Sequence, residues 1–267
     1  MLTLEEIHIY PVKSLPGVRL SKAQVAEKGL LFDRRMMLID ESGRFMTQRT
    51  TPAMCMFDVS LEEGIFYVSD RSGKRNGEIQ IDLTGKISGS AIKAEIWDDE
   101  VEVIEPDMSA SAWFSQALGI KCRLVAFPEK NPRRIDPDYS PEEKQVSLAD
   151  GYPILIISRE SLDLLNSKLE QPVGMERFRP NLVFSGGNSH QEDFLKRFRI
   201  GNNIFATVKP CARCVLTTVN QMTGELGIEP LKTLNTYRKQ GSKVNFGMNI
   251  IPVDYGQIQE GDEIVVV

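Results

Sequence analysis

Apolar and polar residues alternate in short segments along roughly the first hundred residues of the chain, a pattern typical of half-buried β-strands. The segments cover residues 6–12, 18–26, 35–49, 56–70, 78–83 and 93–105. Residues that favour turns separate them, and segment 35–49 predicts a hairpin whose turn lies at 40–43. Short strands at this spacing predict a β-barrel or a β-sandwich.

Three later segments carry apolar residues at helical spacing instead. The first helix can be capped by Asp107 or Ser109, the second by Ser158, and Pro230 lies in the first turn of the third. Further strands are expected at 122–127, 152–158, 181–186, 199–208, 246–253 and 263–267. These patterns predict a mainly β fold of the α+β kind, with an N-terminal β-barrel-like domain at 1–120 and a mostly β domain with a few helices at 121–267.

Residues 128–151 follow neither pattern. Four prolines, mixed charge and the lack of periodicity predict a loop over this stretch. A connection of this length inside a domain is usually either functional or disordered. The sequence therefore leaves open whether the segment is a mobile surface loop or part of a site.

The composition is that of an ordinary globular protein, with 41% apolar and 26% charged residues among 267. The net charge of −5 argues against a general affinity for nucleic acid, so any basic site must be local. No apolar run is long enough to span a membrane, and acidic residues stand at the N-terminus where a signal peptide would be basic. We therefore expect a cytoplasmic protein that binds neither nucleic acid nor a membrane.

The segment KPCARCVLTT, residues 209–218, places Cys211 and Cys214 in a Cys-x-x-Cys pair. A structural zinc site needs four ligands, and the remaining cysteines and histidines are isolated along the chain: Cys55, Cys122, His8 and His190. A thioredoxin-type dithiol usually stands at a helix N-terminus, whereas the β-branched residues after Cys214 predict a strand. Two small core residues are the plainest alternative, because free cysteine is often buried.

A third interpretation needs only one of the two thiols. Arg213 lies between the cysteines and Lys209 precedes them, and nearby cations stabilise the thiolate, which is the form that binds metals. Thiolates suit soft or high-valent metal centres rather than magnesium or calcium. One protein thiolate is sufficient when an organic cofactor supplies the other ligands.

Basic residues also stand at the edges of predicted strands, namely Lys13, Arg34 and Arg179, with Ser14 beside the first. Each of them alone is typical of a surface or ion-paired position. Together with backbone N–H groups they predict a pocket for a small phosphorylated ligand.

These residues lie in segments that resemble the MOSC domain family. The segments are IYPVKS (9–14), GLLFDRRMMLID (29–40), RFRPNLVFSG (177–186), PCARCVLTTV (210–219) and TGE…PLKTLNTYR (223–238). They follow the family's order over nearly the whole chain, which is similar to two-part members such as the amidoxime-reducing components and the N-hydroxylated base-analogue reductases. The resemblance implies a MOSC N-terminal β-barrel domain followed by a MOSC β-barrel domain.

The resemblance further implies a molybdenum cofactor of the molybdopterin type, held in a cleft between the two domains. Cys214 would be the metal ligand and the catalytic residue, and Cys211 would support it. The implied cofactor contacts are Lys13, Ser14, Arg34, Asp150, Gly151, Tyr152, Arg179, Ala212 and Arg213. Asn249 is expected at the same pocket, although relatives often carry an aromatic residue in that strand.

The activity that the resemblance implies is the reduction of small N-hydroxylated substrates. Because the sequence has no iron–sulfur cysteine pattern, the electrons are expected from a separate ferredoxin-, flavin- or haem-type protein. MOSC domains also resemble the C-terminal part of molybdenum cofactor sulfurases, so a sulfur carrier or cofactor-binding module without turnover is the alternative. A pocket for another phosphorylated ligand stays open as well. His190 lies in a polar stretch and is expected to be exposed rather than to act as an acid.

Overall fold

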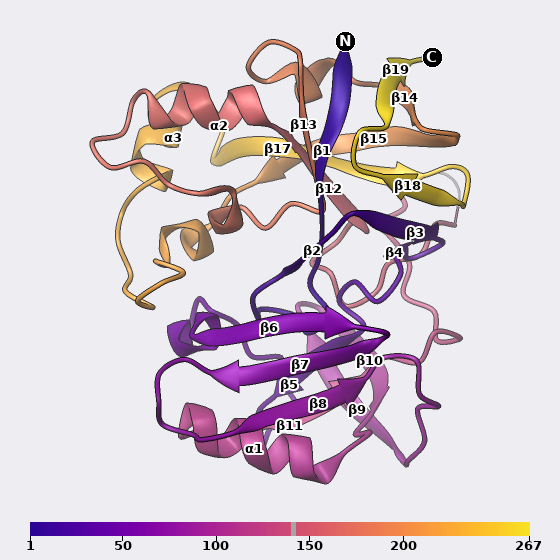
Figure 1. Ribbon diagram of the computed structural model, residues 1–267, viewed down its shortest axis with the longest axis vertical. Coiled ribbons are helices and arrows are strands. Elements are labelled where there is room, and N and C mark those ends of the chain that lie inside the picture. The colour runs from indigo at the N-terminus through magenta and orange to yellow at the C-terminus, as the bar shows by residue number, and fades with distance from the viewer. Residues whose placement is uncertain (140–142) are drawn as a thin grey trace.

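The structure is a computed structural model that describes residues 1–139 and 143–267, and it is mainly β with three α-helices in these ranges (Figure 1). Seven strands close into a barrel, the upper part of the molecule in Figure 1. Their order around the ring is β12 (Ile154–Ser158), β13 (Leu182–Ser185), β1 (Leu2–Ile9), β19 (Glu263–Val266), β14 (Arg197–Ile200), β15 (Asn203–Ala212) and β17 (Lys243–Pro252). The barrel closes where β17 pairs with β12, which confirms the mainly β prediction.

One cluster of buried apolar side chains draws on all seven barrel strands. Phe184, Phe198 and Phe205 in this cluster are fully buried, and the rings of Phe198 and Phe205 stack with their centroids 5.9 Å apart. Burying a side chain of this size contributes about 1.5–3 kcal/mol. Because a slip of one residue would turn these side chains to the other face, the apolar positions set the register of the strands.

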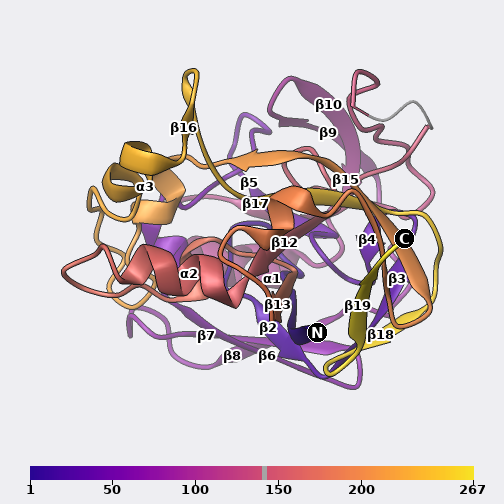
Figure 2. The same ribbon diagram turned by 90° about the horizontal axis from the view of Figure 1, so that it is seen from above.

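Shorter elements surround the barrel. β2 (Val18–Leu20) pairs with β1, β16 (Lys239–Gln240) pairs with β17, and β18 (Gln257–Gln259), β3 (Lys22–Ala26) and β4 (Gly29–Leu30) form a small sheet. The helices α2 (Arg159–Asn166) and α3 (Leu231–Tyr237) lie on one side of the barrel, and β3 and β18 lie on the other (Figure 2). As the sequence predicts, the Ser158 side chain caps α2 by accepting a hydrogen bond from the Ser161 N–H at 3.1 Å.

Two antiparallel sheets from the first half of the chain, here called the N-terminal sheets, form the lower part of the molecule in Figure 1. One contains β5 (Met36–Ile39), β11 (Arg123–Ala126), β10 (Asp99–Ile104) and β9 (Ala91–Ile96), and the other contains β6 (Phe57–Glu62), β7 (Ile65–Asp70) and β8 (Glu78–Asp82). The helix α1 (Met108–Leu118) packs Trp113 and Phe114 against Phe57. Of the two caps that the sequence offers for α1, the structure uses Asp107.

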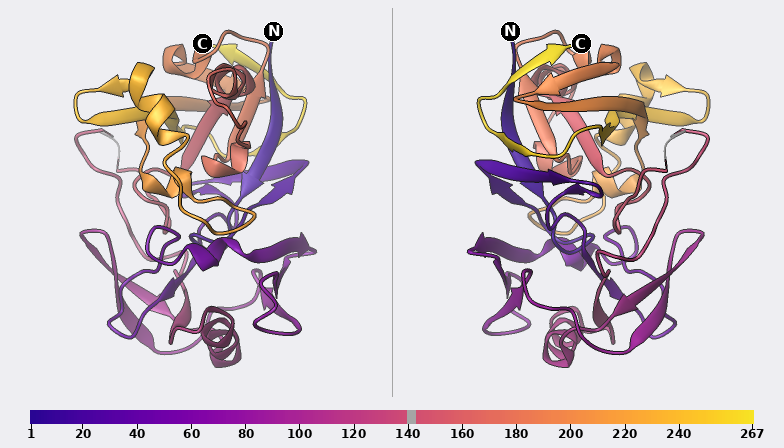
Figure 3. Two further views of the ribbon diagram at one scale, coloured as in Figure 1. Left: turned by 90° about the vertical axis from the view of Figure 1, so that its left-hand side faces the viewer. Right: turned by 90° about the vertical axis from the view of Figure 1, so that its right-hand side faces the viewer.

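The first strand of the chain belongs to the barrel, next to the last strand. Both termini lie at the end of the barrel that is remote from the N-terminal sheets (Figure 3). The division of the chain near residue 120 therefore stays a prediction, because residues before it contribute strands to both parts.

The predicted loop at 128–151 contains no helix or strand among its described residues, and residues 140–142 of that prediction lie outside them. The segment nevertheless has a firm anchor in Arg133, which is 6% exposed. Its guanidinium donates to the carbonyls of Ser147, Ala149 and Asp150 and pairs with Asp99 at 2.8 Å. These bonds fix the end of the loop, residues 147–150, against β10.

The structure corrects two expectations about local structure. Residues Val215–Thr218 form a 3-10 helix rather than a strand, because the hydroxyls of Thr217 and Thr218 bond to the carbonyls of Cys214 and Val215. The return strand of the hairpin expected at 35–49 is reduced to a single bridge between Ile39 and Phe45. Three further 3-10 helices cover Pro52–Cys55, Met175–Arg177 and Gln191–Phe194. In the described part of the chain, no helix has both the length and the apolar character that crossing a membrane requires.

Candidate functional site

A cavity lies where the barrel meets the N-terminal sheets, and it encloses about 870 Å³ of empty space, part of which is open to solvent. All eleven residues predicted for the site line it: Lys13, Ser14, Arg34, Asp150, Gly151, Tyr152, Arg179, Ala212, Arg213, Cys214 and Asn249. They come from the segments that follow β1, precede β5, β12 and β13, and end β15, and from β17 itself. The structure thus brings every candidate together, while the role of each stays a prediction.

Three of these residues have left-handed backbone conformations. The φ angles are 67° for Ser14, 48° for Arg34 and 54° for Arg179. Such angles cost non-glycine residues of the order of 1–3 kcal/mol each and are often retained where function requires them. The guanidinium carbons of Arg34 and Arg179 both lie 4.2 Å from the centroid of the Tyr10 ring, so this buried ring holds two cations at the cavity wall.

Lys13 and Asp150 form an ion pair at the cavity surface. The Lys13 Nζ lies 2.5 Å from the Asp150 Oδ1 and 2.8 Å from the Leu148 carbonyl oxygen. Burial lowers the pKa of Lys13 to about 8, although Asp150 opposes the shift. Desolvation alone would raise the pKa of the Asp150 carboxyl. The charge of Lys13 and the hydrogen bonds from Lys13 and the Trp97 indole outweigh this effect and hold the pKa well below its usual range. Because the Asp150 side chain is 73% exposed to the open cavity, solvent screens part of this attraction.

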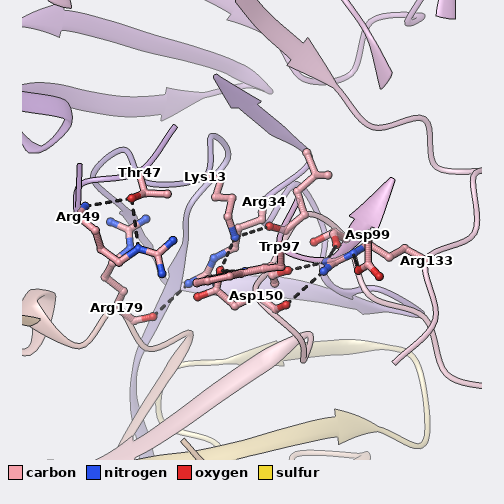
Figure 4. A network of polar contacts seen from close by, with 12 residues as sticks. Lys13, Arg34, Thr47, Arg49, Trp97, Asp99, Arg133, Asp150 and Arg179 are labelled. Atoms are coloured by element: carbon pink, nitrogen blue, oxygen red, sulfur yellow. Dashed lines mark hydrogen bonds and ion pairs between the residues drawn. The ribbon is translucent and has the colours of Figure 1, made fainter. Parts of the chain in front are cut away.

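Arg34 is fixed by a buried network. Its Nη1 donates to Asp33 Oδ2 at 2.7 Å and to Asn181 Oδ1 at 2.9 Å, and its Nη2 donates to the Arg179 carbonyl at 3.2 Å. Asp33 is fully buried and also accepts the Tyr10 N–H at 2.8 Å. The positive charge of Arg34 is therefore balanced inside the wall, and Figure 4 shows how closely Arg34, Lys13 and Asp150 lie together.

Three other cations at the cavity have no carboxylate within 4 Å among residues 1–139 and 143–267: Arg49, Arg179 and Arg213. Arg179 is only 8% exposed, and its pKa is lowered to about 10 by burial and by the nearby charge of Arg34. A protein of net charge −5 thus concentrates uncompensated positive charge on one cavity. Such an arrangement favours an anionic ligand.

The two cysteines of the Cys-x-x-Cys pair both line the cavity, with Cys214 exposed and Cys211 half-buried. The Arg213 Nη1 donates to the Cys211 Sγ at 3.0 Å, and its Nη2 donates to the Phe178 carbonyl at 2.7 Å. The guanidinium is therefore bound to Cys211, whereas the exposed Cys214 lines the cavity directly before the 3-10 helix.

The expected exposure of His190 is wrong. Both ring nitrogens are buried without a hydrogen-bond partner in the described residues, and the ring packs beside Tyr237 and Phe246. Burial and, to a smaller extent, the charge of Arg238 lower the pKa of His190 to about 4. His190 does not line the cavity.

Sequence reasoning missed several residues of the cavity wall, among them Phe45, Thr47, Arg49, Asn181 and Thr217. Arg49 and Thr47 stand in the predicted return strand, where alternation alone gave no functional signal. The sequence identified Asn181 only as the first residue of a predicted strand. In the structure its side chain accepts hydrogen bonds from Arg34 and from the Leu155 N–H.

The residues present fit a bound anionic cofactor with one protein metal ligand. The Arg213 Nε and the Tyr152 hydroxyl are buried without a hydrogen-bond partner among residues 1–139 and 143–267, so donors are available at the cavity. No three His, Cys, Asp or Glu side chains come together as a metal site within the described ranges. Cys214 is the exposed thiol of the cavity.

Comparison with known proteins matches the MOSC N-terminal beta barrel domain to residues 1–121 and the MOSC domain to residues 143–265. The chain is 31% identical to the molybdenum cofactor sulfurase of Oryza sativa subsp. japonica over 97% of its length, which is 33% of that protein. It is also 31% identical to mitochondrial amidoxime-reducing component 1 of Mus musculus and of Homo sapiens, over 98% of its own length. This covers 81% of the mouse protein and 82% of the human protein, whereas the chain spans only about a third of the sulfurase.

Proposed function

The chain belongs to the MOSC domain family, and on that premise we propose that it is a molybdenum-cofactor-dependent reductase of small N-hydroxylated compounds. The observation that carries the proposal is one cavity that joins an exposed thiol, Cys214, to three cations without carboxylate partners in the described residues. The relatives named as amidoxime-reducing components support the substrate class.

Each side chain has a physical role in this proposal. The Cys214 thiolate is the protein ligand to molybdenum. Lys13, Arg34 and Arg179 contact the phosphate of the pterin, and Arg179 supplies the charge that no carboxylate of the described residues balances. The Ser14 hydroxyl donates to a phosphate oxygen. Asp150 keeps the Lys13 ammonium group in place, because the two form the ion pair at 2.5 Å.

When bound, the cofactor would supply the two electrons that cleave the N–O bond. The overall reaction consumes two electrons and two protons and converts R–NHOH to R–NH₂ and water. The electrons come from a separate ferredoxin-, flavin- or haem-type protein in this proposal. The cytoplasmic location expected from the sequence stays a prediction.

The test is to purify the protein from a host that makes the cofactor and to measure molybdenum and pterin. Cys214→Ala should lose stoichiometric molybdenum while remaining folded, whereas Cys211→Ala, in the same cavity, should retain most of it. If Cys214→Ala keeps full molybdenum, the ligand assignment is wrong. Oxidation of the reduced, loaded protein by benzamidoxime or a hydroxylamine then tests the reductase activity.

The match to the rice sulfurase over 97% of the chain favours a second candidate, a sulfur carrier or cofactor-binding module without turnover. Under this alternative Cys214 carries a persulfide or transfers the cofactor. Cofactor binding without substrate-dependent oxidation, together with 32 Da of added mass on the Cys214 peptide, the mass of one sulfur atom, would favour the carrier.

A further inference from the structure

A second groove continues the cavity on the side of Arg49. It shares Phe45, Thr47 and Arg49 with the cavity, adds Trp97, and encloses about 750 Å³ of partly open space. We call it the Trp97 groove. The proposed function assigns no role to it.

Trp97 occupies an unfavourable position for a large aromatic residue. It stands in the two-residue connection between β9 and β10 with a φ of 56°, a left-handed conformation that glycine adopts without strain. Its side chain is 46% exposed, so burial compensates little of this cost. The indole is nevertheless held in a defined position, since its Nε1 donates to the Asp150 Oδ1 at 3.0 Å. An exposed indole in a strained but fixed position indicates a binding surface.

Arg49 lies against this indole with its guanidinium carbon 4.1 Å from the ring centroid (Figure 4). Its backbone N–H and its Nε both donate to the Thr47 Oγ1, at 3.1 and 3.3 Å. No carboxylate of the described residues forms an ion pair with Arg49: Asp150 pairs with Lys13, Glu95 pairs with Arg44, and Asp98, which also lines the groove, is not within 4 Å of the guanidinium. Because Arg49 lines both the cavity and the groove, its charge is available to an anion that binds where the two meet.

We propose that the Trp97 groove binds a planar heterocyclic group that carries a phosphate or carboxylate. The heterocycle stacks on the exposed part of the indole, as bases stack on aromatic side chains, and the anion pairs with Arg49. A neutral planar ligand would leave Arg49 unused, so the anionic group is part of the recognition. Two sources share this chemistry: a nucleotide extension of the pterin cofactor, and a free anionic substrate. Deciding whether the ligand is part of the cofactor or a substrate rests on the proposed function. The proposal that the groove binds an anionic heterocycle does not depend on that function.

The first experiment titrates guanosine 5′-monophosphate into the full chain, purified from a host that cannot make the pterin, by calorimetry. Trp97→Ala and Arg49→Gln should each weaken binding roughly tenfold, and Trp97→Phe should stay within about threefold of wild type. Lys93→Gln is the matched control, since Lys93 belongs to the neighbouring strand β9 but lies outside the groove, where it pairs with Glu100, and it should bind as wild type does. Guanosine and inorganic phosphate should each bind more weakly than the nucleotide. Unchanged affinity in Trp97→Ala and Arg49→Gln, or equal affinity for nucleotide and phosphate, overturns the proposal.

The second experiment separates the two sources in molybdenum-loaded protein. Phosphodiesterase release of one nucleoside monophosphate per extracted pterin assigns the groove to the cofactor. A pterin without nucleotide, combined with retained binding of guanosine 5′-monophosphate, assigns it to a substrate. Loss of that binding in loaded protein whose pterin has no nucleotide contradicts the proposal. Absence of molybdenum would refute the proposed function alone, because the titration of cofactor-free protein does not depend on it.

Discussion

Arg179→Met should make the cofactor-free protein more stable and the cofactor-bound protein harder to form. Arg179 is 8% exposed, and its guanidinium makes no hydrogen bond or ion pair in the part of the chain that the structure describes. Burial lowers its pKa from 12.5 to about 10, and each pKa unit corresponds to about 1.4 kcal/mol. The charged guanidinium therefore destabilises the folded, empty protein by roughly 3 kcal/mol.

Part of this cost is offset in the wild-type protein. The stacking of Arg179 on Tyr10 contributes about 0.5–2 kcal/mol. Methionine keeps an unbranched stem and removes the charge, so we expect the free energy of unfolding to rise by about 1–2 kcal/mol. The unfolded chain binds more protons than the folded protein between the folded pKa of about 10 and the unfolded value of 12.5, so the penalty is complete at pH 7 and decreases only above pH 10.

Arg34→Met is the matched control, because Arg34 contacts the same Tyr10 ring but pairs with the fully buried Asp33. Removing Arg34 leaves that carboxylate unpaired, which should destabilise the protein by about 3–5 kcal/mol. Urea unfolding of both variants without cofactor measures the two changes, and molybdenum content measures cofactor retention. If Arg179→Met destabilises the empty protein as much as Arg34→Met, the charge of Arg179 is not uncompensated and the reasoning fails.

Two further predictions concern the cavity and the barrel. Raising the pH from 7 to 9 should weaken binding of inorganic phosphate to the cofactor-free protein, because Lys13, with its pKa lowered to about 8, loses its charge in this range. Calorimetry should show that Lys13→Met loses less phosphate affinity over the same pH range than the wild-type protein does. Equal losses of affinity would show that Lys13 is not part of the anion site. Gly247→Ala should lower the free energy of unfolding by about 2–4 kcal/mol, since φ is +83° and the new Cβ would lie 2.6 Å from Ile157 Cγ1. Gly261→Ala, with φ of +91° and no neighbour within 4 Å, should cost only about 1–2 kcal/mol in the same urea assay, and equal costs would contradict the steric argument.

The sequence predicted those parts of the fold that follow from local pattern. Alternating or continuous apolar segments located strands of the barrel and of the N-terminal sheets. Ser158, and Asp107 as one of two candidates, were recognisable as helix caps because such side chains bond to nearby backbone N–H groups. The closure of the barrel was not readable in this way, since it depends on pairing β17 with β12 across about ninety residues of chain.

The errors have physical causes at particular residues. The β-branched residues after Cys214 suggested a strand, but threonine hydroxyls that bond to preceding carbonyls stabilise a 3-10 turn there. His190 stands in a polar stretch, yet aromatic rings from distant segments cover it. The sequence did not indicate that Trp97 and Arg49 form a site. Their contact joins residues far apart in the chain and depends on a strained turn at Trp97, and neither feature is visible in the pattern of apolar residues.

Hydrogen bonds that do not involve the charged side chains lining the cavity hold its two walls together. Gln48 is fully buried, donates its Nε2 to the Ser14 carbonyl at 2.7 Å and accepts a hydrogen bond from the Gln221 Nε2 at 2.9 Å. Arg71 then donates to the Gln221 carbonyl at 2.7 Å, which ties the segment after Cys214 to the N-terminal sheets. Since the hydrogen bonds of Gln48 are neutral and buried or half-buried, added salt should leave the geometry of the cavity unchanged. The same salt should weaken anion binding by Arg49, Arg179 and Arg213, so the fold separates the bonds that build the site from the charges that a ligand uses.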